Sequence, residues 1–164
     1  MGLAKIFWIF SLLAFLAVLL VTYIYMPETV AILFDELGLP FYFVSRDNYF
    51  YFALLVCLAF NVAILLLAAS INRLPSWMLP TPKRRYWSLR ENRPRFAKRF
   101  SNWTKGIAFF LNLLLCLWLI NILKGNDSQV DFNTKPLSYL FASLLVVWIG
   151  MYFVIFGIYV EKMD

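Results

Sequence analysis

The sequence predicts an all-α membrane protein with four transmembrane helices, and three observations carry this prediction. Of its 164 residues, 63% are hydrophobic and 15% are charged, whereas a soluble domain is about half apolar and about a quarter charged. The mean hydropathy is +0.75. Four long apolar runs contain no Lys, Arg, Asp or Glu, and most basic residues lie between the second and third runs. A soluble enzyme, a disordered tail and a disulfide scaffold are therefore excluded.

The predicted spans cover residues 6–26, 49–71, 106–123 and 137–160 of one membrane domain, 1–164. A helix needs about 20 apolar residues to cross a hydrocarbon core of about 30 Å. The third run is the shortest, but flanking Lys and Trp side chains can snorkel to the interfaces. The first run also resembles a signal peptide, yet no small-x-small cleavage pattern ends it, which favours a retained anchor.

The distribution of Lys and Arg predicts the orientation. The loop 72–105 carries ten basic residues and a single acidic one, Glu91. The other two loops, 27–48 and 125–136, hold one basic residue each, Arg46 and Lys135, with several acids. We therefore expect the basic loop to be cytoplasmic, which puts both termini in the cytoplasm and the other loops outside.

The outer loop between the first two spans has the periodicity of a short amphipathic helix. Its apolar residues at positions i, i+3, i+4 and i+7 are Val30, Leu33, Phe34 and Leu37. Pro27 suits the start of such a helix, and Gly38 followed by Pro40 suits its end. We expect a helix on the outer leaflet that serves as an anchor or as a docking site for a partner or lipid.

The basic loop predicts a second amphipathic helix that continues into the third span. After Pro94, the apolar Phe96, Phe100 and Trp103 recur at i, i+4 and i+7, with basic residues on the other faces. Anionic lipid headgroups attract such a segment, so we expect the bilayer to be its partner. Docking of a protein partner is the alternative. Nucleic acid is the competing polyanion and is not expected, since the aromatic residues have a nearby membrane to enter.

The chain contains no histidine and no ionisable residue within its spans. Transporters, proton relays and voltage sensors keep such groups inside the bilayer, so a transporter or membrane enzyme is disfavoured. We expect no catalytic residues, no metal site and no cofactor. Cys57 and Cys116 lie at similar depth and are interpreted as small apolar residues rather than a disulfide.

The polar residues that the spans do contain suit helix packing. We expect Asn61 and Asn112 to form an interhelical hydrogen bond, with contact to a ligand as the alternative. Ser143, Gly150 and Gly157 recur every seven residues and so lie on one narrow helix face. This face allows close approach of another helix, either within the chain or in a partner subunit.

Two loops carry motifs of characteristic residues and spacing. The outer-loop motif consists of Pro27, Phe34, Asp35, Gly38, Pro40, Ser45 and Arg46. The cytoplasmic motif consists of Pro82, Arg84, Tyr86, Trp87, Glu91 and Arg93. Both motifs resemble those of a bacterial membrane-protein domain of unknown function that also opens the sporulation-delaying-toxin immunity (SdpI-type) proteins. Leu33 stands where the family carries a histidine. The resemblance covers roughly residues 1–125 and implies a multi-pass protein of the bacterial cytoplasmic (inner) membrane.

These observations together predict a non-enzymatic accessory, assembly or interaction subunit whose partners are other membrane subunits or a second copy. The expected interaction residues are Arg84, Tyr86, Trp87, Glu91 and Arg93, with Tyr86 and Trp87 at headgroup level and Glu91 paired to a neighbouring arginine. The alternative is a membrane sensor or immunity protein that binds a peptide or small ligand at its outer loop.

Overall fold

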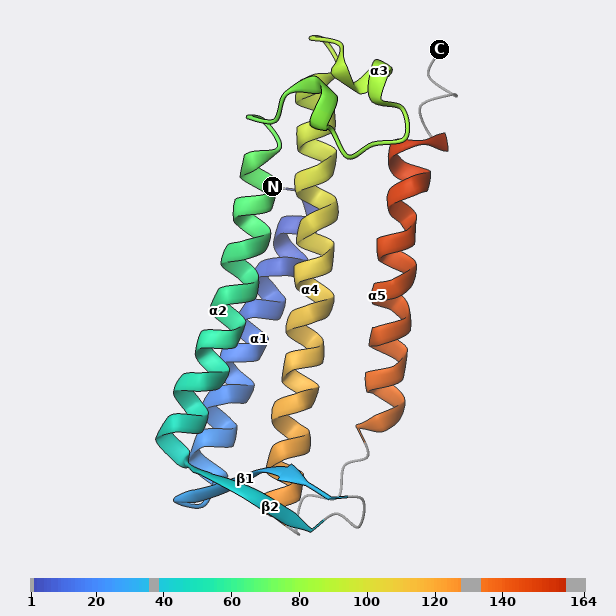
Figure 1. Cartoon of the computed structure of the whole chain (residues 1–164). Helices are drawn as coiled ribbons and strands as arrows, with labels where there is room; N and C mark the ends of the chain where they lie inside the picture. The colour runs from blue at the N-terminus through green and yellow to red at the C-terminus, as the bar shows by residue number, and fades with distance from the viewer. Residues whose placement is uncertain (1, 36–38, 128–133, 159–164) are drawn as a thin grey trace.

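The computed structural model describes residues 2–35, 39–127 and 134–158. Its long helices run up and down between two ends (Figure 1). They are α1 (Leu3–Tyr25), α2 (Arg46–Ser70), α4 (Arg93–Asn126) and α5 (Lys135–Phe156). Among the described residues, these four helices are long and apolar enough to cross a membrane. The protein is therefore a multi-pass membrane protein with its spans where the sequence predicts them.

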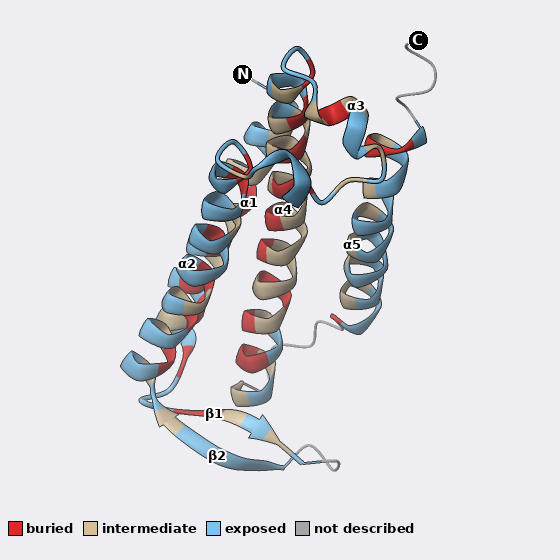
Figure 2. Ribbon diagram, turned by 45° about the horizontal axis from the view of Figure 1, so that its top comes forward, coloured by how far each residue is buried: buried red, intermediate tan, exposed pale blue. Residues whose placement is uncertain are grey.

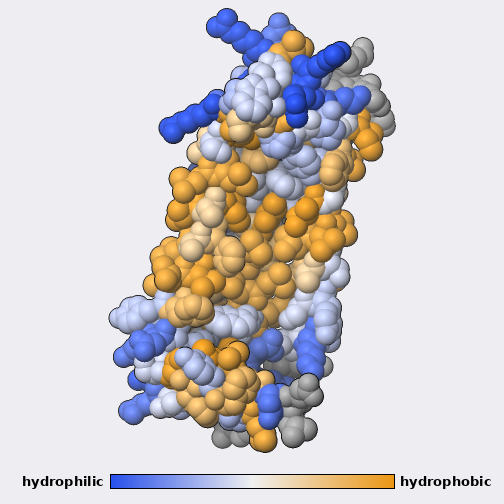
Figure 3. All heavy atoms as spheres, viewed as in Figure 1, coloured by the Kyte–Doolittle hydropathy of each residue, from blue (hydrophilic) through white to orange (hydrophobic). Residues whose placement is uncertain are grey.

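The two ends of the bundle differ in structure and in hydropathy. At the hairpin end, β1 (Thr29–Phe34) and β2 (Pro40–Ser45) connect α1 to α2. At the basic end, a 3₁₀ turn, η1 (Ser76–Met78), and a short helix, α3 (Arg84–Ser88), connect α2 to α4. On the face seen in Figure 3, hydrophobic residues cover the middle of the bundle between two more hydrophilic ends. This distribution is that of a protein embedded in a bilayer.

The amphipathic helix predicted between Pro27 and Pro40 is wrong for the residues that the structure describes. Residues 29–34 and 40–45 pair instead as antiparallel strands, with Val30 opposite Val44 and Leu33 opposite Tyr42. β-branched and aromatic residues fill both segments and favour the extended conformation, and Pro40 stands at the first position of its strand, where proline is tolerated. Leu37 and Gly38 of the predicted helix lie outside the described residues.

Helix α4 is the longest element, with 34 residues. At 1.5 Å per residue it extends about 50 Å, well beyond a hydrocarbon core of about 30 Å. It begins with a proline in its first turn, where the missing N–H has no helical partner to lose. Residues 93–105 of the basic loop are thus helical and continuous with the third span.

The buried residues gather around α4. Helices α1 and α2 pack on one side of α4, and α5 packs against another side (Figure 2). One apolar cluster fills the hairpin half of the α1–α2–α4 bundle and includes Phe15, Leu19, Ala53, Leu119 and Ile122. A second cluster at the basic end joins α3, α4 and α5 and includes Trp87, Phe96, Phe100 and Phe156.

Candidate interaction surfaces

A polar network in the middle of the bundle joins α1, α2 and α4. The Asn61 side-chain amide donates to the Asn112 Oδ1 at 2.8 Å and to the Cys57 carbonyl at 2.8 Å. Asn112 donates in turn to the Ser11 hydroxyl at 3.1 Å, and the Trp8 indole donates to the Asn61 Oδ1 at 2.7 Å. The two asparagines therefore bond directly, as expected of an interhelical pair, and the structure adds Trp8 and Ser11 as partners.

Both cysteines belong to the buried apolar cluster of α1, α2 and α4. Cys57 and Cys116 are free thiols, and the Cys57 Sγ lies 3.9 Å from the Asn112 Oδ1. Both thiols pack among apolar side chains of α1, α2 and α4. This placement agrees with their interpretation as small apolar residues.

The structure separates the five predicted interaction residues into two groups. Trp87 is only 2% exposed and its indole donates to the Phe156 carbonyl at 2.9 Å. Its ring packs against Phe96 and against the half-buried Tyr86. Trp87 therefore holds α3 against α4 and α5 inside the chain, which leaves it little surface for the interaction that the sequence predicts.

Arg93 also turns inward. Its guanidinium donates to the Ile71 carbonyl at 3.1 Å and to the Leu74 carbonyl, which are acceptors at and just beyond the C-terminal end of α2, where carbonyls lack helical partners. Arg84 and Glu91 are exposed. Within the described part of the chain no ion pair joins Glu91 to an arginine, so the expected pairing is absent there.

The small-residue stripe of α5 faces away from the rest of the chain over most of its length. Ser143 and Gly150 are exposed, and a Cβ added at Gly150 would meet no atom within 4 Å. Of the two glycines, Gly157 does have a neighbour among the described residues of another segment, since a Cβ there would lie 3.8 Å from the Pro82 Cβ. Ser143 and Gly150 are therefore not packed against the described part of the chain.

The opposite face of α5 is fastened to α4 by two tryptophans. The Trp103 indole donates to the Trp148 carbonyl at 3.0 Å, and the Trp148 indole donates to the Trp103 carbonyl at 2.9 Å. Gly106 leaves the room for this contact, because a Cβ there would lie 2.3 Å from the Trp148 ring. This reciprocal pair defines which face of α5 is left outward.

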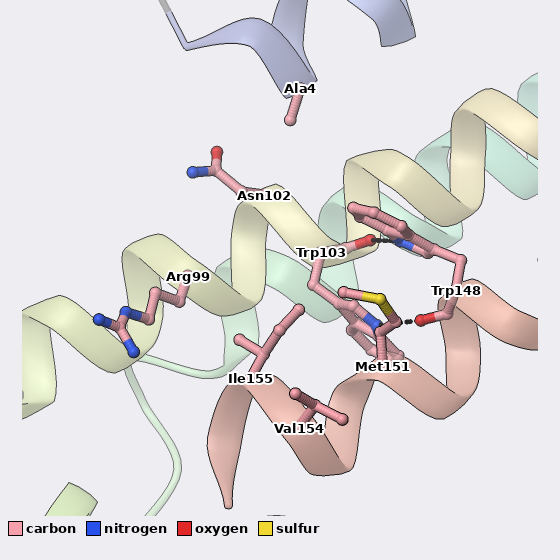
Figure 4. A pocket seen from close by; sticks show the side chains of 8 residues that line it. All are labelled: Ala4, Arg99, Asn102, Trp103, Trp148, Met151, Val154 and Ile155. Carbon is pink, nitrogen blue, oxygen red and sulfur yellow. Dashed lines mark hydrogen bonds between the residues drawn. The ribbon is translucent and has the colours of Figure 1, made fainter. Parts of the chain in front are cut away.

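An apolar groove lies between α1 and α5, with α4 at its base (Figure 4). Its volume is about 430 Å³, and Trp103, Trp148, Met151 and Val154 line it. Arg99 and Asn102 of α4 also line it, and the Arg99 Cζ lies 5.5 Å from the centre of the Trp87 ring. A second cavity of about 320 Å³, lined by Phe7, Gly106 and Phe110, shares Ala4 and Trp148 with it.

No pattern in the sequence indicates the cavity at the hairpin end. This cavity, of about 450 Å³, is formed by Tyr42 and Val44 of β2, Tyr49 and Phe52 of α2, and Trp118 of α4. The hairpin is held over it by Asn126, whose amide both donates to and accepts from the Ala31 backbone at 2.8 Å. Its residues come from segments far apart in the chain, so no local pattern reveals it.

Comparison with known proteins finds no match: no family model, no curated protein and no solved structure matches this chain. The resemblance to SdpI-type proteins stays a prediction that depends on the motif residues alone.

Proposed function

We propose that this protein is a non-enzymatic accessory or interaction subunit of the bacterial inner membrane, which binds another membrane protein or a second copy through α5. The observation that carries the proposal is the outward face of α5. In the most apolar window of α5 only 6% of residues are buried inside the chain, against 39% for α4. On that face lie Ser143 and Gly150, which allow the backbone of another helix to come close.

The outward face continues into the groove between α1 and α5. Val154 follows Gly150 by four residues, which places it on nearly the same face one turn along. Val154 also lines the groove. A partner helix that crosses α5 at Gly150 therefore has a second contact surface beside it, which a lone small-residue stripe would lack.

The polar residues of the spans support a structural role rather than chemistry. The side chains of Trp8, Ser11, Asn61 and Asn112 are bonded to one another or to backbone within the bundle. A network satisfied in this way fixes helix positions. It gives the bundle a rigid frame on which α5 presents its outer face.

The orientation of the bundle belongs to the same proposal. With the basic end in the cytoplasm, its Lys and Arg side chains meet anionic headgroups and both termini are cytoplasmic, in agreement with the positive-inside rule. The exposed Arg84 and Glu91 then remain available to a cytoplasmic part of the partner.

Gentle detergent extraction of the tagged protein from its native membrane, followed by mass spectrometry and sizing, tests the proposal. We expect a stoichiometric partner, either another subunit or a second copy, with the wild type. Gly150→Leu should lose it, because the added side chain separates the helices. Ala142→Leu is the matched control, since it adds similar bulk about 100° around the helix from Ser143. Recovery of the wild type alone, or an unchanged complex with Gly150→Leu, would contradict the proposal.

The cavity beneath the hairpin favours a second candidate, a sensor or immunity protein that binds a peptide or small ligand from outside. Tyr42, Tyr49 and Trp118 give this cavity aromatic walls, which are typical of ligand sites. The resemblance to SdpI-type proteins points the same way. Sensitivity to a peptide toxin in cells that lack the protein, restored to resistance by the wild type but not by Trp118→Ala, would favour this candidate.

A further inference from the structure

A shallow cavity of about 530 Å³ lies at the basic end between α2 and α4, away from the face that carries α5. The last turns of α2 supply Leu65 and Ala68 to one wall. The first turns of α4 supply Lys98, Ser101 and Lys105 to the other, and Asn72 lines it from just beyond α2. Pro94 and Ala97 of α4 complete the lining, so the charged groups all lie on α4, which forms the polar wall, while α2 supplies an apolar wall.

The polar wall concentrates positive charge. Lys98 and Lys105 are seven residues apart, so they lie on the same face of α4, with Ser101 between them. The Lys105 Nζ donates to the Ser101 Oγ at 2.9 Å. This bond draws the ammonium back toward the basic end, as expected of a lysine that snorkels out of hydrocarbon.

No acidic residue is among the described side chains that line this cavity. No ion pair within the described ranges neutralises Lys98 or Lys105. Two ammonium groups and a hydroxyl thus line one cavity without a counter-charge from its described lining residues. An anion completes such a site.

We propose that this cavity binds the phosphate of an anionic phospholipid. Lys98, Ser101 and Lys105 donate hydrogen bonds to the phosphate oxygens, and Asn72 lies within the same headgroup layer. An acyl chain follows Leu65 and Ala68 along α2 into the membrane. A free phosphate would use only the polar wall. A phospholipid matches both walls, because its phosphate meets the polar wall and its acyl chain follows the apolar wall.

The full-length protein in detergent, stripped of lipid and titrated with phosphatidylglycerol or phosphatidylcholine, provides the test, with native mass spectrometry as readout. The wild type should prefer phosphatidylglycerol. Lys98→Gln/Lys105→Gln should lose this preference, with affinity about 30-fold lower if each lysine contributes a typical near-surface attraction. Arg90→Gln/Arg95→Gln removes two charges from the same basic segment without touching the cavity and should keep the preference.

Two further variants keep the proposal falsifiable if the glutamine pair fails to fold. Lys98→Arg/Lys105→Arg retains the charge and should bind phosphatidylglycerol. Ala69→Phe fills the α2 wall with both lysines intact and should exclude the lipid. The proposal would be overturned if Lys98→Gln/Lys105→Gln and Arg90→Gln/Arg95→Gln lost affinity equally, or if the wild type showed no preference. It would also be overturned if Ala69→Phe still bound the lipid, or if glycerol phosphate displaced phosphatidylglycerol completely.

Discussion

Asn61 and Asn112 illustrate how single polar residues fix helix positions in an apolar bundle. Lipid tails are as apolar as leucine, so burial alone gives little preference for one helix packing over another. A hydrogen bond of 2.8 Å between these amides does favour one packing over others. Their placement was predictable, because a polar residue inside an apolar run has few uses other than to face another helix.

The first prediction follows from this bond. Asn112→Leu should destabilise the protein by about 1–2 kcal/mol, because one buried Asn61 N–H loses its acceptor while the Asn61 oxygen keeps its bond from Trp8. Asn61→Leu/Asn112→Leu should cost less than the sum of the single changes, with a coupling of about 1 kcal/mol. Unfolding by SDS, followed by tryptophan fluorescence, measures these differences.

A control double-mutant cycle pairs Asn112 with Asn121, whose side chain bonds to Thr134 and not to Asn61 or Asn112. Asn121 is nine residues from Asn112, or about 13 Å along the helix, so Asn112→Leu and Asn121→Leu should add within about 0.5 kcal/mol. Additive behaviour of Asn61 and Asn112 as well would show that their bond contributes nothing.

The second prediction concerns Trp87, which the sequence assigned to a partner and the structure assigns to packing. Trp87→Ala should cost about 3–5 kcal/mol, because it empties a site among Phe96, Phe156 and Tyr86. Trp87→Phe should cost less, about 1–3 kcal/mol, since an aromatic ring stays but the bond to the Phe156 carbonyl and part of the buried indole volume are lost. Trp77→Ala, at a side chain that is 70% exposed, is the control; a comparable loss there would refute the assignment.

The inward direction of Trp87 and Arg93 could not be read from the loop sequence. Aromatic and basic residues near a span are typical of the membrane interface, and this favoured an exposed position. The acceptor for Trp87 is Phe156, 69 residues later in the chain. Contacts at that separation depend on where the end of α5 lies, which local spacing does not specify.

At the scale of helices, two glycines that look alike in the sequence have opposite surroundings. Gly106→Ala should cost about 1–3 kcal/mol, because its Cβ would overlap the Trp148 ring and push α5 from α4. Gly150→Ala meets nothing, and its higher helix propensity should leave stability unchanged or raise it by up to about 1 kcal/mol. Thermal unfolding of the two variants in one detergent compares them; equal shifts would be inconsistent with the structure.

The hairpin shows where periodicity alone misleads. Val30, Leu33 and Phe34 satisfy helical spacing, yet the stretch from Thr29 to Phe34 is also rich in β-branched residues. Its choice of strand depends on a partner, residues 40–45, and on Asn126 at the end of α4. Neither partner lies within residues 30–37, where the helical spacing was counted, so that spacing could not reveal the strand pairing.

The fourth prediction tests the hold of Asn126 on β1. Asn126→Ala removes both bonds to the Ala31 backbone and should weaken the hairpin by about 2 kcal/mol. Amide hydrogen exchange in residues 29–34 and 40–45 should then quicken, while exchange in α1, α2 and α4 stays the same. Asn48→Ala, which leaves these bonds in place, is the control, and unaltered hairpin exchange in Asn126→Ala would speak against the contact.

At the scale of the molecule, the spans were the most predictable feature because the bilayer imposes their length and composition. The order in which they pack was not predictable. α4 lies at the centre, and α5 touches the bundle mainly through α4. This arrangement results from long-range contacts such as Gly106 with Trp148, and it creates the outward face and the groove on which the proposed interaction depends.

The last prediction concerns the orientation of the whole chain. Because ten basic residues lie in 72–105, translocation of this segment is strongly disfavoured and the basic end should be cytoplasmic. With Cys57 and Cys116 replaced by Ser, a cysteine at Leu39, whose side chain is 60% exposed, should react with a membrane-impermeant maleimide on intact cells. A cysteine at Arg84 should react only after lysis. The reverse pattern would place the hairpin inside and the basic loop outside. That result would contradict the orientation expected from the charge asymmetry and would exclude a cytoplasmic partner for Arg84 and Glu91.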